Sequence, residues 1–595
     1  MILQALTQYY EDLLALGAIE RPGWSKSKVS YGLVLNDEGQ LTQLLHLQTE
    51  VVRGKKTVLA PQELLAPSPA KRSSGVLANF LCDNSSYLLG VDAKGKPTRT
   101  AECFAAAKAL HLGLLEQADS PAARAVVRFF ECWDPAQAAG HPALQEDWDD
   151  LLKAGNLIFW YENVPVTQDP VVADAWTQHY GAVDDAAEPI RCLVTGRCGP
   201  LARLHPNIKG VAGAQSSGAS LVSFNASAFC SYDHEQGANA PVSEYAAFAY
   251  ASALNTLLSD RDRVCRVGDT TILCWAAGGD SNYQDCFIAN MFGDSHSETG
   301  LLNTLHHLAK GEHIAWNGNR LDPDTRFYVL GLAPNAARLS VRFFWQNTFG
   351  RMARNLARHY DRLNIIRPAY DKFPTLPVWR LVQETVRKPS PGTRPAEPNP
   401  RLAGDLLLAV LNDMPYPATL LDGTALRIRA ECNVSRGQAA IIKAYYLRNS
   451  SNPKLKEVMT VELNEQSTYL PYVLGRLFAV LEEVQQSANR GIKTTIEVQQ
   501  SANRDIKTTI KDRYFNAASA TPSTVFPLLI NLAQKHLAKL DGGLSLYYQK
   551  KISNLIDRIT QTLPARMALP EQGAFQLGYY HETQKRYAKS KKEES

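Results

Sequence analysis

Four arginines at helical spacing are the best-defined candidates for binding chemistry in this sequence: Arg351, Arg354, Arg358 and Arg362. At about 100° per residue they share one narrow helix face, and the apolar residues between them occupy a separate face. A row of guanidinium groups can follow the phosphates of a nucleic-acid backbone. The alternative is a solvated face paired with acids. Because Asp361 is the only acid within the expected helix, the sequence favours backbone binding.

Two loops near the N-terminus combine cations with hydroxyl and amide groups. One is VVRGKK (51–56), and the other is the proline-braced PSPAKRSSG (67–75), followed by two asparagines. Such groups can reach phosphates and base edges, and asparagine amides pair best with adenine. An ordinary solvated surface loop is the competing interpretation. The candidate contacts are Arg53, Lys55, Lys56, Lys71, Arg72, Ser73, Ser74, Asn79 and Asn84.

A third candidate region runs from a glycine- and serine-rich stretch (209–220) into a polar loop (223–240). Glycines let the backbone approach an anion closely, with N–H groups as donors. The loop opens a helix expected from Pro241 and Ser243 onward, and helix N-termini favour polar or anionic ligands. A flexible linker and a self-bonded surface loop are the alternatives. The candidates here are Lys209, Gln215, Ser216, Gln236 and Asn239.

Catalytic and metal-binding motifs are not evident. GVDAKGK (90–96) fits the first seven positions of a phosphate-binding loop, but Pro97 stands where Ser or Thr should follow. The segment also resembles a hairpin turn with no helix after it. Cys192 and Cys198 lack the second close pair that a zinc site needs, so reduced, packed cysteines are expected. The sequence therefore predicts no cofactor, no metal and no enzymatic activity.

Composition places the chain among globular proteins with more than one domain. It has 595 residues, 45% hydrophobic and 21% charged, with a net charge of +4. Any nucleic-acid binding must therefore depend on local basic patches. The first helix lacks the features of a signal peptide, and no apolar run reaches the ~18 residues of a membrane span. A cytoplasmic protein without membrane contact is expected.

The pattern along the chain predicts an α+β fold in two main parts. Residues 1–385 read as a mixed α+β domain, with hairpins at 30–48 and 80–96. Residues 386–401, with five prolines, read as a linker or long loop. Residues 402–595 read as a helical bundle. Near-identical 14-residue copies at 483–496 and 497–510 indicate a local duplication without assigned function. Bundle cations that could line a groove for a single strand, or be ordinary surface charge, are Lys511, Arg513, Lys535, Lys539, Lys550 and Lys551.

Several long stretches of the sequence resemble one protein family. They are GVLANFLCDNSSYLLGVD (75–92), 192–258, ARLSVRFFW (337–345), KDRYFNAASATPSTVFP (511–527) and GAFQLGYYH (573–581). Together they resemble the large subunit of the type I-C CRISPR Cascade, and they span nearly the whole chain. The resemblance implies a non-catalytic, RNA-guided, DNA-binding subunit of an antiviral ribonucleoprotein complex. Its implied partners are crRNA, double-stranded target DNA, the displaced single strand, other Cascade subunits and a recruited helicase-nuclease.

The resemblance also implies specific roles. The 1–385 domain is expected to contact the 5′ handle of the guide and to recognise the protospacer-adjacent motif, which starts R-loop formation. The loop of Lys71 and Arg72, together with the 236–239 loop, is the hypothesised motif reader. A small subunit translated from an internal start is also implied, and Met459 is the candidate start, which would make 459–595 a separate bundle. The alternatives are a metal-dependent nuclease built from scattered carboxylates and a scaffold that does not read DNA.

Overall fold

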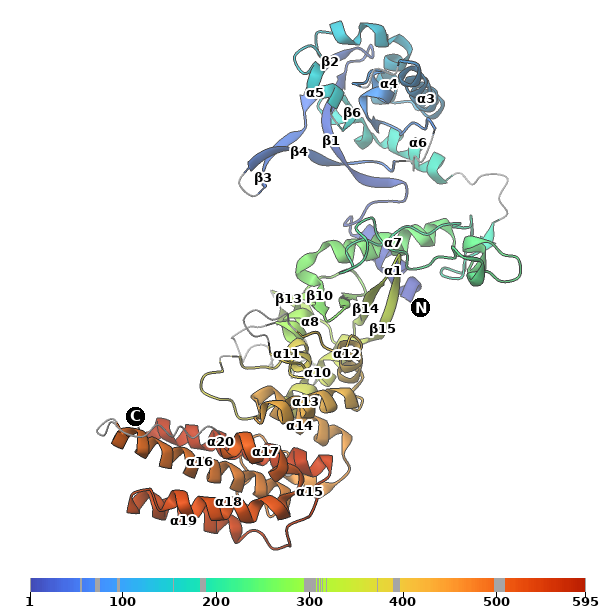
Figure 1. Cartoon of the computed structure of the whole chain (residues 1–595). Coiled ribbons are helices and arrows are strands. Elements are labelled where there is room, and N and C mark those ends of the chain that lie inside the picture. The colour runs from blue at the N-terminus through green and yellow to red at the C-terminus, as the bar shows by residue number, and fades with distance from the viewer. Residues whose placement is uncertain are drawn as a thin grey trace. The chain divides into compact units, whose positions relative to one another are not determined.

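The computed structural model describes residues 2–53, 56–69, 75–93, 97–153, 155–181, 189–293, 307, 310, 312, 314–316, 318–371, 373–388, 396–496 and 509–593 (Figure 1). Apart from the first two residues, the chain forms two compact units. The first comprises 3–206 and 223–253, and the second comprises 207–222 and 254–595. Strands and helices occur together in the N-terminal part and helices alone toward the C-terminus, so the predicted α+β class is confirmed.

The first unit is built on a mixed sheet, which has seven strands within the described residues. Its path is β3-β4-β1-β6-β5, with β2 added to β1 and β7 to β6. The predicted hairpin at 30–48 is confirmed as the antiparallel β1–β2 pair, and β1 runs parallel to β6 on its other side. The strands are β1 Trp24–Leu35, β2 Leu41–His46, β3 Gln48–Arg53, β4 Lys56–Pro67, β5 Cys82–Asp83, β6 Asn156–Tyr161 and β7 Val164–Pro165.

Helices cover this sheet through an aromatic core. Phe129 and Phe130 of α4 pack against Phe159 of β6, and all three side chains are buried. Ser120 starts α4 by accepting a hydrogen bond from the Ala123 N–H at 3.1 Å. The helices around this core are α2 Ser85–Leu88, α3 Pro97–Leu115, α4 Pro121–Cys132, α5 Trp148–Lys153 and α6 Pro170–Gly181. Helices α1 Ile2–Ala15 and α7 Glu244–Ser259 contribute no residue to it, and α7 extends from the first unit into the second. A short pair joins β8 Ile190–Arg191 to β9 Cys198–Gly199.

The predicted hairpin at 80–96 is wrong. Its described residues, 80–93, form the two-residue β5 and then the short helix α2, which Asn84 caps by accepting a bond from the Ser86 N–H at 3.0 Å. Helix α3 begins at Pro97, so a helix does follow the GVDAKGK stretch. The argument against a phosphate-binding loop therefore rests on Pro97 alone, while residues 94–96 lie outside the described residues.

The second unit begins with an antiparallel sheet in the order β10-β11-β14-β15. Strand β11 is buried along its whole length and β14 along most of it. The 207–222 segment is bound to this sheet: Ile208 bridges Ala219, and Ser220 bridges Arg338. It is therefore a structured loop in this unit. The strands are β10 Cys265–Val267, β11 Thr270–Ala276, β12 Ile314–Trp316, β13 Asn319–Leu321, β14 Arg326–Asn335 and β15 Arg338–Thr348.

A single hydrophobic core joins this sheet to the C-terminal helices. Buried residues of one cluster run from Val267 to Tyr580, on both sides of the proline-rich segment. The division of the chain into two compact units does not fall at residue 385, and residues 389–395 lie outside the described ones. The helices are α8 Asn282–Phe292, α10 Phe349–Leu363, α11 Val378–Gln383, α12 Leu402–Asn412, α13 Ala418–Glu431, α14 Arg436–Asn449, α15 Pro453–Glu457, α16 Leu470–Ile496, α17 Ile510–Ala520, α18 Pro522–Leu537, α19 Gly542–Ile556 and α20 Leu569–Glu593.

Two glycines let α16 and α20 lie in backbone contact. A Cβ atom on Gly475 would lie 1.9 Å from the Phe575 carbonyl oxygen, and one on Gly578 would lie 2.3 Å from the Tyr472 carbonyl oxygen. Any larger residue would force these helices apart. No helix within the described ranges is long and apolar enough to cross a membrane.

Candidate nucleic-acid interface

The arginine row lies on α10, as the sequence predicts. The Thr348 hydroxyl starts the helix by accepting from the Arg351 N–H at 3.3 Å. Met352 and Leu356 are fully buried on one face. On the other face, Arg351, Arg354 and Arg358 are exposed and Arg362 is half-buried. The two-faced helix is therefore confirmed.

The neutralisation of this row differs from the prediction. Asp413, in the left-handed conformation that ends α12, points its carboxylate at the row. It pairs with Arg358 at 3.0 Å, with Arg362 at 2.5 Å and with Arg448 of α14 at 3.7 Å. Burial raises the pKa of Asp413, but the arginines outweigh burial and hold this pKa below its usual value. One carboxylate from outside the helix thus pairs with three guanidinium groups. The cluster of Asp413, Arg358, Arg362 and Arg448 therefore has a net positive charge.

Two buried groups fix the C-terminal half of α10. The Lys443 ammonium donates to the carbonyl oxygens of Asp361 and Arg362, at 3.3 and 2.8 Å, where the helix dipole is negative. Burial lowers the pKa of Lys443 to about 8. The His359 ring is 2.7 Å from the Tyr416 hydroxyl, and burial lowers its pKa to about 3. These contacts hold the arginine face in a fixed direction.

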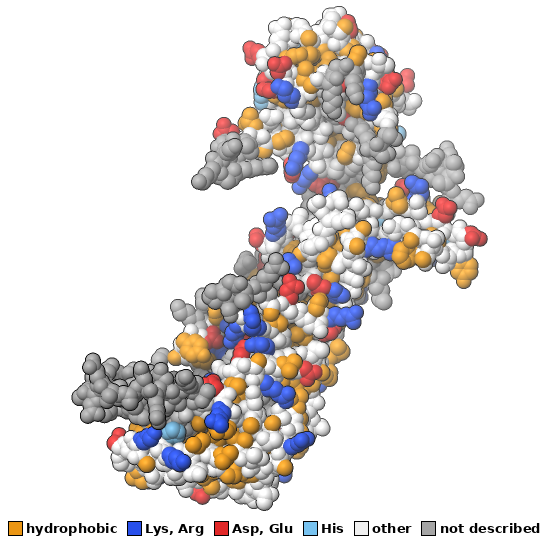
Figure 2. Space-filling model, in the orientation of Figure 1, with side chains coloured by type: hydrophobic (Ala, Val, Ile, Leu, Met, Phe, Trp, Pro, Cys, Tyr) orange, Lys and Arg blue, Asp and Glu red, His pale blue; other side chains and the backbone are white. Residues whose placement is uncertain are grey.

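Basic side chains of the second unit lie in several small groups on the face seen in Figure 2, with acidic side chains among them. This distribution agrees with a net charge of only +4. Local clusters such as the one at Asp413 therefore provide the candidate binding surfaces.

The glycine- and serine-rich loop is a separate surface. Its glycines at 210, 213 and 218 all have left-handed φ angles, and Lys209, Gln215 and Ser216 are exposed. The Lys209 N–H donates to the Asn255 amide oxygen at 2.8 Å. Ser220 of this loop pairs with Arg338, the first residue of β15, whereas α10 begins directly after Thr348, the last residue of β15. At about 3.3 Å per residue, the two ends of β15 are roughly 33 Å apart. The structure therefore does not bring the glycine- and serine-rich loop and the arginine row together.

The polar loop 223–240 has an unusual backbone. Tyr232, Asp233 and Gln236 have φ angles of 54°, 57° and 44°. The side-chain amide of Asn239 holds the loop from inside. Its Oδ1 atom accepts from the Ser231 N–H at 2.8 Å, and its Nδ2 group donates to the backbone carbonyls of His234 and Gln236 at 3.0 Å each. The loop borders an open hollow of about 540 Å³.

Sequence reasoning treated Tyr232 only as a hydrogen-bonding residue of this loop and missed Phe229, so neither ring was considered as a stacking surface. Phe229 and Tyr232 are 46% and 93% exposed. Aromatic rings placed in water within a polar loop offer a stacking surface for bases. Their occurrence in an otherwise polar stretch is the signal that could have identified them.

Of the other predicted contacts, only some can be located. Arg53 and Lys56 are paired backbone positions in the β3–β4 register. Lys55, Lys71, Arg72, Ser73 and Ser74 lie outside the described residues. Asn79 is buried, and the Asn84 side chain caps α2.

All ten cysteines lie in the described part of the chain and are free thiols. The buried Cys192 sulfur accepts hydrogen bonds from the Ser243 and Val194 N–H groups, at 3.2 and 3.4 Å. Burial raises the pKa of this thiol, but bonds from Ser243 and Thr195 outweigh burial and lower it to about 7. The sulfur thus joins the β8–β9 turn to the start of α7. Within the described ranges, no three His, Cys, Asp or Glu side chains are grouped as metal ligands.

Comparison with known families defines the class of this protein. The chain matches the family model of a CRISPR-associated protein (Cas_Csd1) over residues 6–587. It therefore belongs to the CRISPR-associated Cas_Csd1 family, whose members are Cascade-type proteins. A comparison with curated proteins gave no match.

Proposed function

We propose that this chain is the large subunit of a type I-C, crRNA-guided antiviral complex and that its 223–240 loop reads the protospacer-adjacent motif. Membership of the Cas_Csd1 family supports the first part. The backbone of the loop supports the second, and it is the observation that carries the proposal. Three non-glycine residues in left-handed conformations within five positions are costly, and such conformations gather at ligand-binding sites.

The loop has the properties that base reading requires. Donors and acceptors on base edges are recognised by polar groups held in fixed positions. Asn239 fixes the loop with three hydrogen bonds, so the loop loses little conformational entropy when DNA binds. Tyr232, which is 93% exposed, can contact a base or wedge between two base pairs.

The arginine cluster supplies a second, sequence-independent contact in this proposal. Guanidiniums around Asp413 bind phosphates, which strengthens binding without selecting a sequence. The loop then reads the short motif, base pairing with crRNA reads the target, and the R-loop opens from the motif. On the basis of the family, the proposal also includes contact with the guide handle, recruitment of a helicase-nuclease and action in the cytoplasm.

The test compares crRNA-loaded complexes on duplexes that differ only in the flanking trinucleotide, at several salt concentrations. Tyr232→Ala should remove the preference for one flank, whereas Tyr370→Ala, at an 84% exposed tyrosine outside the loop, should preserve it. Equal flank preference in both variants would contradict the assignment. If the wild-type complex bound all flanking sequences equally, the chain would be better described as a scaffold that does not read DNA. Magnesium-dependent cleavage of DNA by the purified chain would favour a nuclease.

A further inference from the structure

A pocket of the second unit lies where α11 and the start of α14 meet residues 368–376, the segment that precedes α11. Its volume is about 410 Å³, which is in the range of small-molecule sites. The lining combines an apolar wall with three cations, and these are Pro368, Phe373 and Leu376, and Arg380, Lys388 and Arg436. Apolar walls with a few polar groups are typical of sites for small ligands.

Arg436 is held by the segment before α11. Its side chain is 9% exposed and donates to the Asp371 carboxylate at 3.0 Å and to the Pro374 carbonyl at 2.6 Å. Burial raises the pKa of Asp371, but the Phe373 N–H and the cations Arg436 and Arg380 outweigh burial and hold this pKa below its usual value. Asp371 is therefore ionised, and its charge is matched by Arg436.

Arg380 lies against the same segment without an acid partner. Its guanidinium carbon is 4.3 Å from the centroid of the Phe373 ring, which is a cation–π distance. The Phe373 carbonyl accepts a bond from Arg436, so one residue contacts both guanidinium groups. Within the described ranges, no carboxylate oxygen lies within 4 Å of the Arg380 guanidinium.

Two buried guanidinium nitrogens in this pocket have no hydrogen-bond acceptor among the residues that the structure describes. They are Nη1 of Arg380 and Nε of Arg436. Buried N–H donors without an acceptor are costly, and folded proteins pair nearly all of them with protein atoms, water or an ion. Both nitrogens belong to cations that contact Phe373. The pair therefore indicates a ligand that brings acceptors and negative charge.

The second acid of the lining, Glu384, does not supply that charge. Its carboxylate accepts from the Ser435 hydroxyl at 2.8 Å, and a Cβ atom on Gly437 would lie 2.5 Å from its Oε1 atom. Glu384 thus lies at the first turn of α14, the positive end of the helix dipole. With Asp371 matched by Arg436 and Glu384 at the helix end, the charge of Arg380 is left uncancelled.

We propose that this pocket binds a small organic oxyanion, a carboxylate or a phosphate monoester, with its charged group at the Arg380 guanidinium and its nonpolar part on the apolar wall. A guanidinium presents a planar fork of donors that matches both anions. The pocket shares no residue with the 223–240 loop or with the arginine cluster at Asp413. The proposal therefore goes beyond the proposed function and does not depend on it.

The test is isothermal titration calorimetry of the purified full chain with benzoate, phenyl phosphate, inorganic phosphate and benzyl alcohol. Benzoate or phenyl phosphate should bind. Benzyl alcohol, which lacks the charge, should bind about 10-fold or more weakly, and Arg380→Gln should weaken binding of the preferred anion by about 10- to 150-fold, because charge-assisted hydrogen bonds are lost. The variant should fold, since the Arg380 guanidinium forms no ion pair within the described residues. Inorganic phosphate should bind more weakly than phenyl phosphate, because it cannot use the apolar wall.

The matched control is Arg387→Gln, which removes the same charge from an exposed arginine just outside the pocket. The pocket is supported if this control binds as the wild type does, and the tighter of benzoate and phenyl phosphate then identifies the anionic group. The proposal is overturned if the wild type binds neither, if benzyl alcohol binds as tightly, or if Arg380→Gln and Arg387→Gln lose affinity equally. None of these results involves flank reading, so this failure is distinct from failure of the proposed function.

Discussion

Replacing Asp413 by asparagine should weaken the fold while strengthening nucleic-acid binding. Its bond with Arg362 joins two side chains that are 18% and 19% exposed, and charge-assisted bonds of this kind contribute about 1.5–3 kcal/mol. The Arg358 side chain is 53% exposed, so its pair contributes less than about 1 kcal/mol. The free energy of unfolding should therefore fall by about 2–3 kcal/mol. Because α10 still presents the arginines, one more unneutralised cation should steepen the salt dependence of duplex binding by up to about 0.9.

Urea unfolding and duplex binding at several salt concentrations measure these two effects on the same protein. Asp405→Asn is the control, because it removes an equal charge from an exposed position of α12, the helix that Asp413 ends. This control should leave both quantities near their wild-type values. A parallel loss of stability and affinity in Asp413→Asn would refute the reasoning, because it would show that the arginines do not meet phosphates.

Three further predictions concern the second unit. Gly475→Ala should lower the free energy of unfolding by about 3 kcal/mol or more in urea titrations, since its Cβ would meet the Phe575 carbonyl, whereas Gly542→Ala, with open space around it, should have little effect. Burial lowers the pKa of His359 and of His581 from 6.5, the value in an unfolded chain, to about 3, so the folded state binds fewer protons. Stability should therefore be lost as pH falls from 6.5 toward 3, by about 1.4 kcal/mol per histidine and pH unit, and His581→Gln should flatten this dependence in pH-resolved unfolding. Met459 is 3% exposed, so Met459→Leu should keep the core while removing the proposed internal start; a short product that persists on immunoblots of expressing cells would contradict that start.

Periodic patterns were enough to predict the regular elements. The β1–β2 hairpin and the two-faced α10 follow from local alternation and from helical spacing. The 80–96 segment was misassigned because a single cap, Asn84, converts an alternating apolar stretch into helix α2. Local side-chain capping overrides hydrophobic pattern there, and the pattern alone does not show it.

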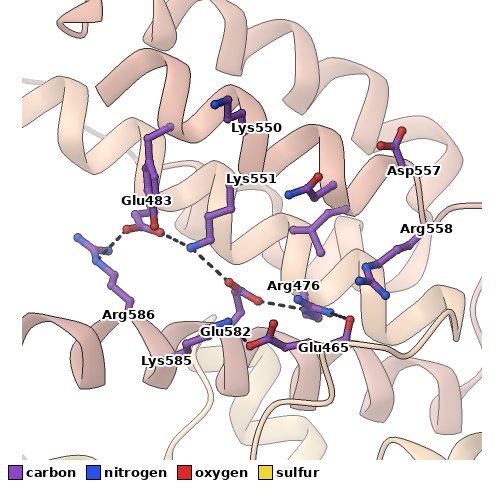
Figure 3. Close-up of a pocket in the computed structure, with 13 residues that line it drawn as sticks. Glu465, Arg476, Glu483, Lys550, Lys551, Asp557, Arg558, Glu582, Lys585 and Arg586 are labelled. Atoms are coloured by element: carbon purple, nitrogen blue, oxygen red, sulfur yellow. Dashed lines mark hydrogen bonds and ion pairs between the residues drawn. The ribbon is translucent and has the colours of Figure 1, made fainter. Parts of the chain in front are cut away.

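The charge environment of the candidate site was less predictable. The sequence shows only Asp361 within the arginine helix, whereas the acid that pairs with the row comes from Asp413, about fifty residues later. The same limit applies to Lys551, which looks like surface charge in the sequence and pairs in the fold with the buried Glu582 and the partly buried Glu483 (Figure 3). Ion pairs depend on tertiary contacts, so sequence spacing predicts where charges lie along a helix but not which of them are neutralised.

The tandem duplication shows how a repeat can be absorbed without a new function. The first copy (483–496) contributes its beginning to the bundle: Glu483 pairs with Lys551, and Gln485 accepts from the Ile510 N–H at 2.9 Å. The second copy (497–510) contributes its end, where Thr509 caps α17 and Ile510 is buried. Because the copies differ only at residues 491 and 505, a chain that lacks 14 residues would retain both sets of side chains. Deletion of 497–510 should therefore change the free energy of unfolding by less than about 1 kcal/mol, and a loss comparable to a core truncation, about 2–5 kcal/mol, would show that the extra copy has a structural role of its own.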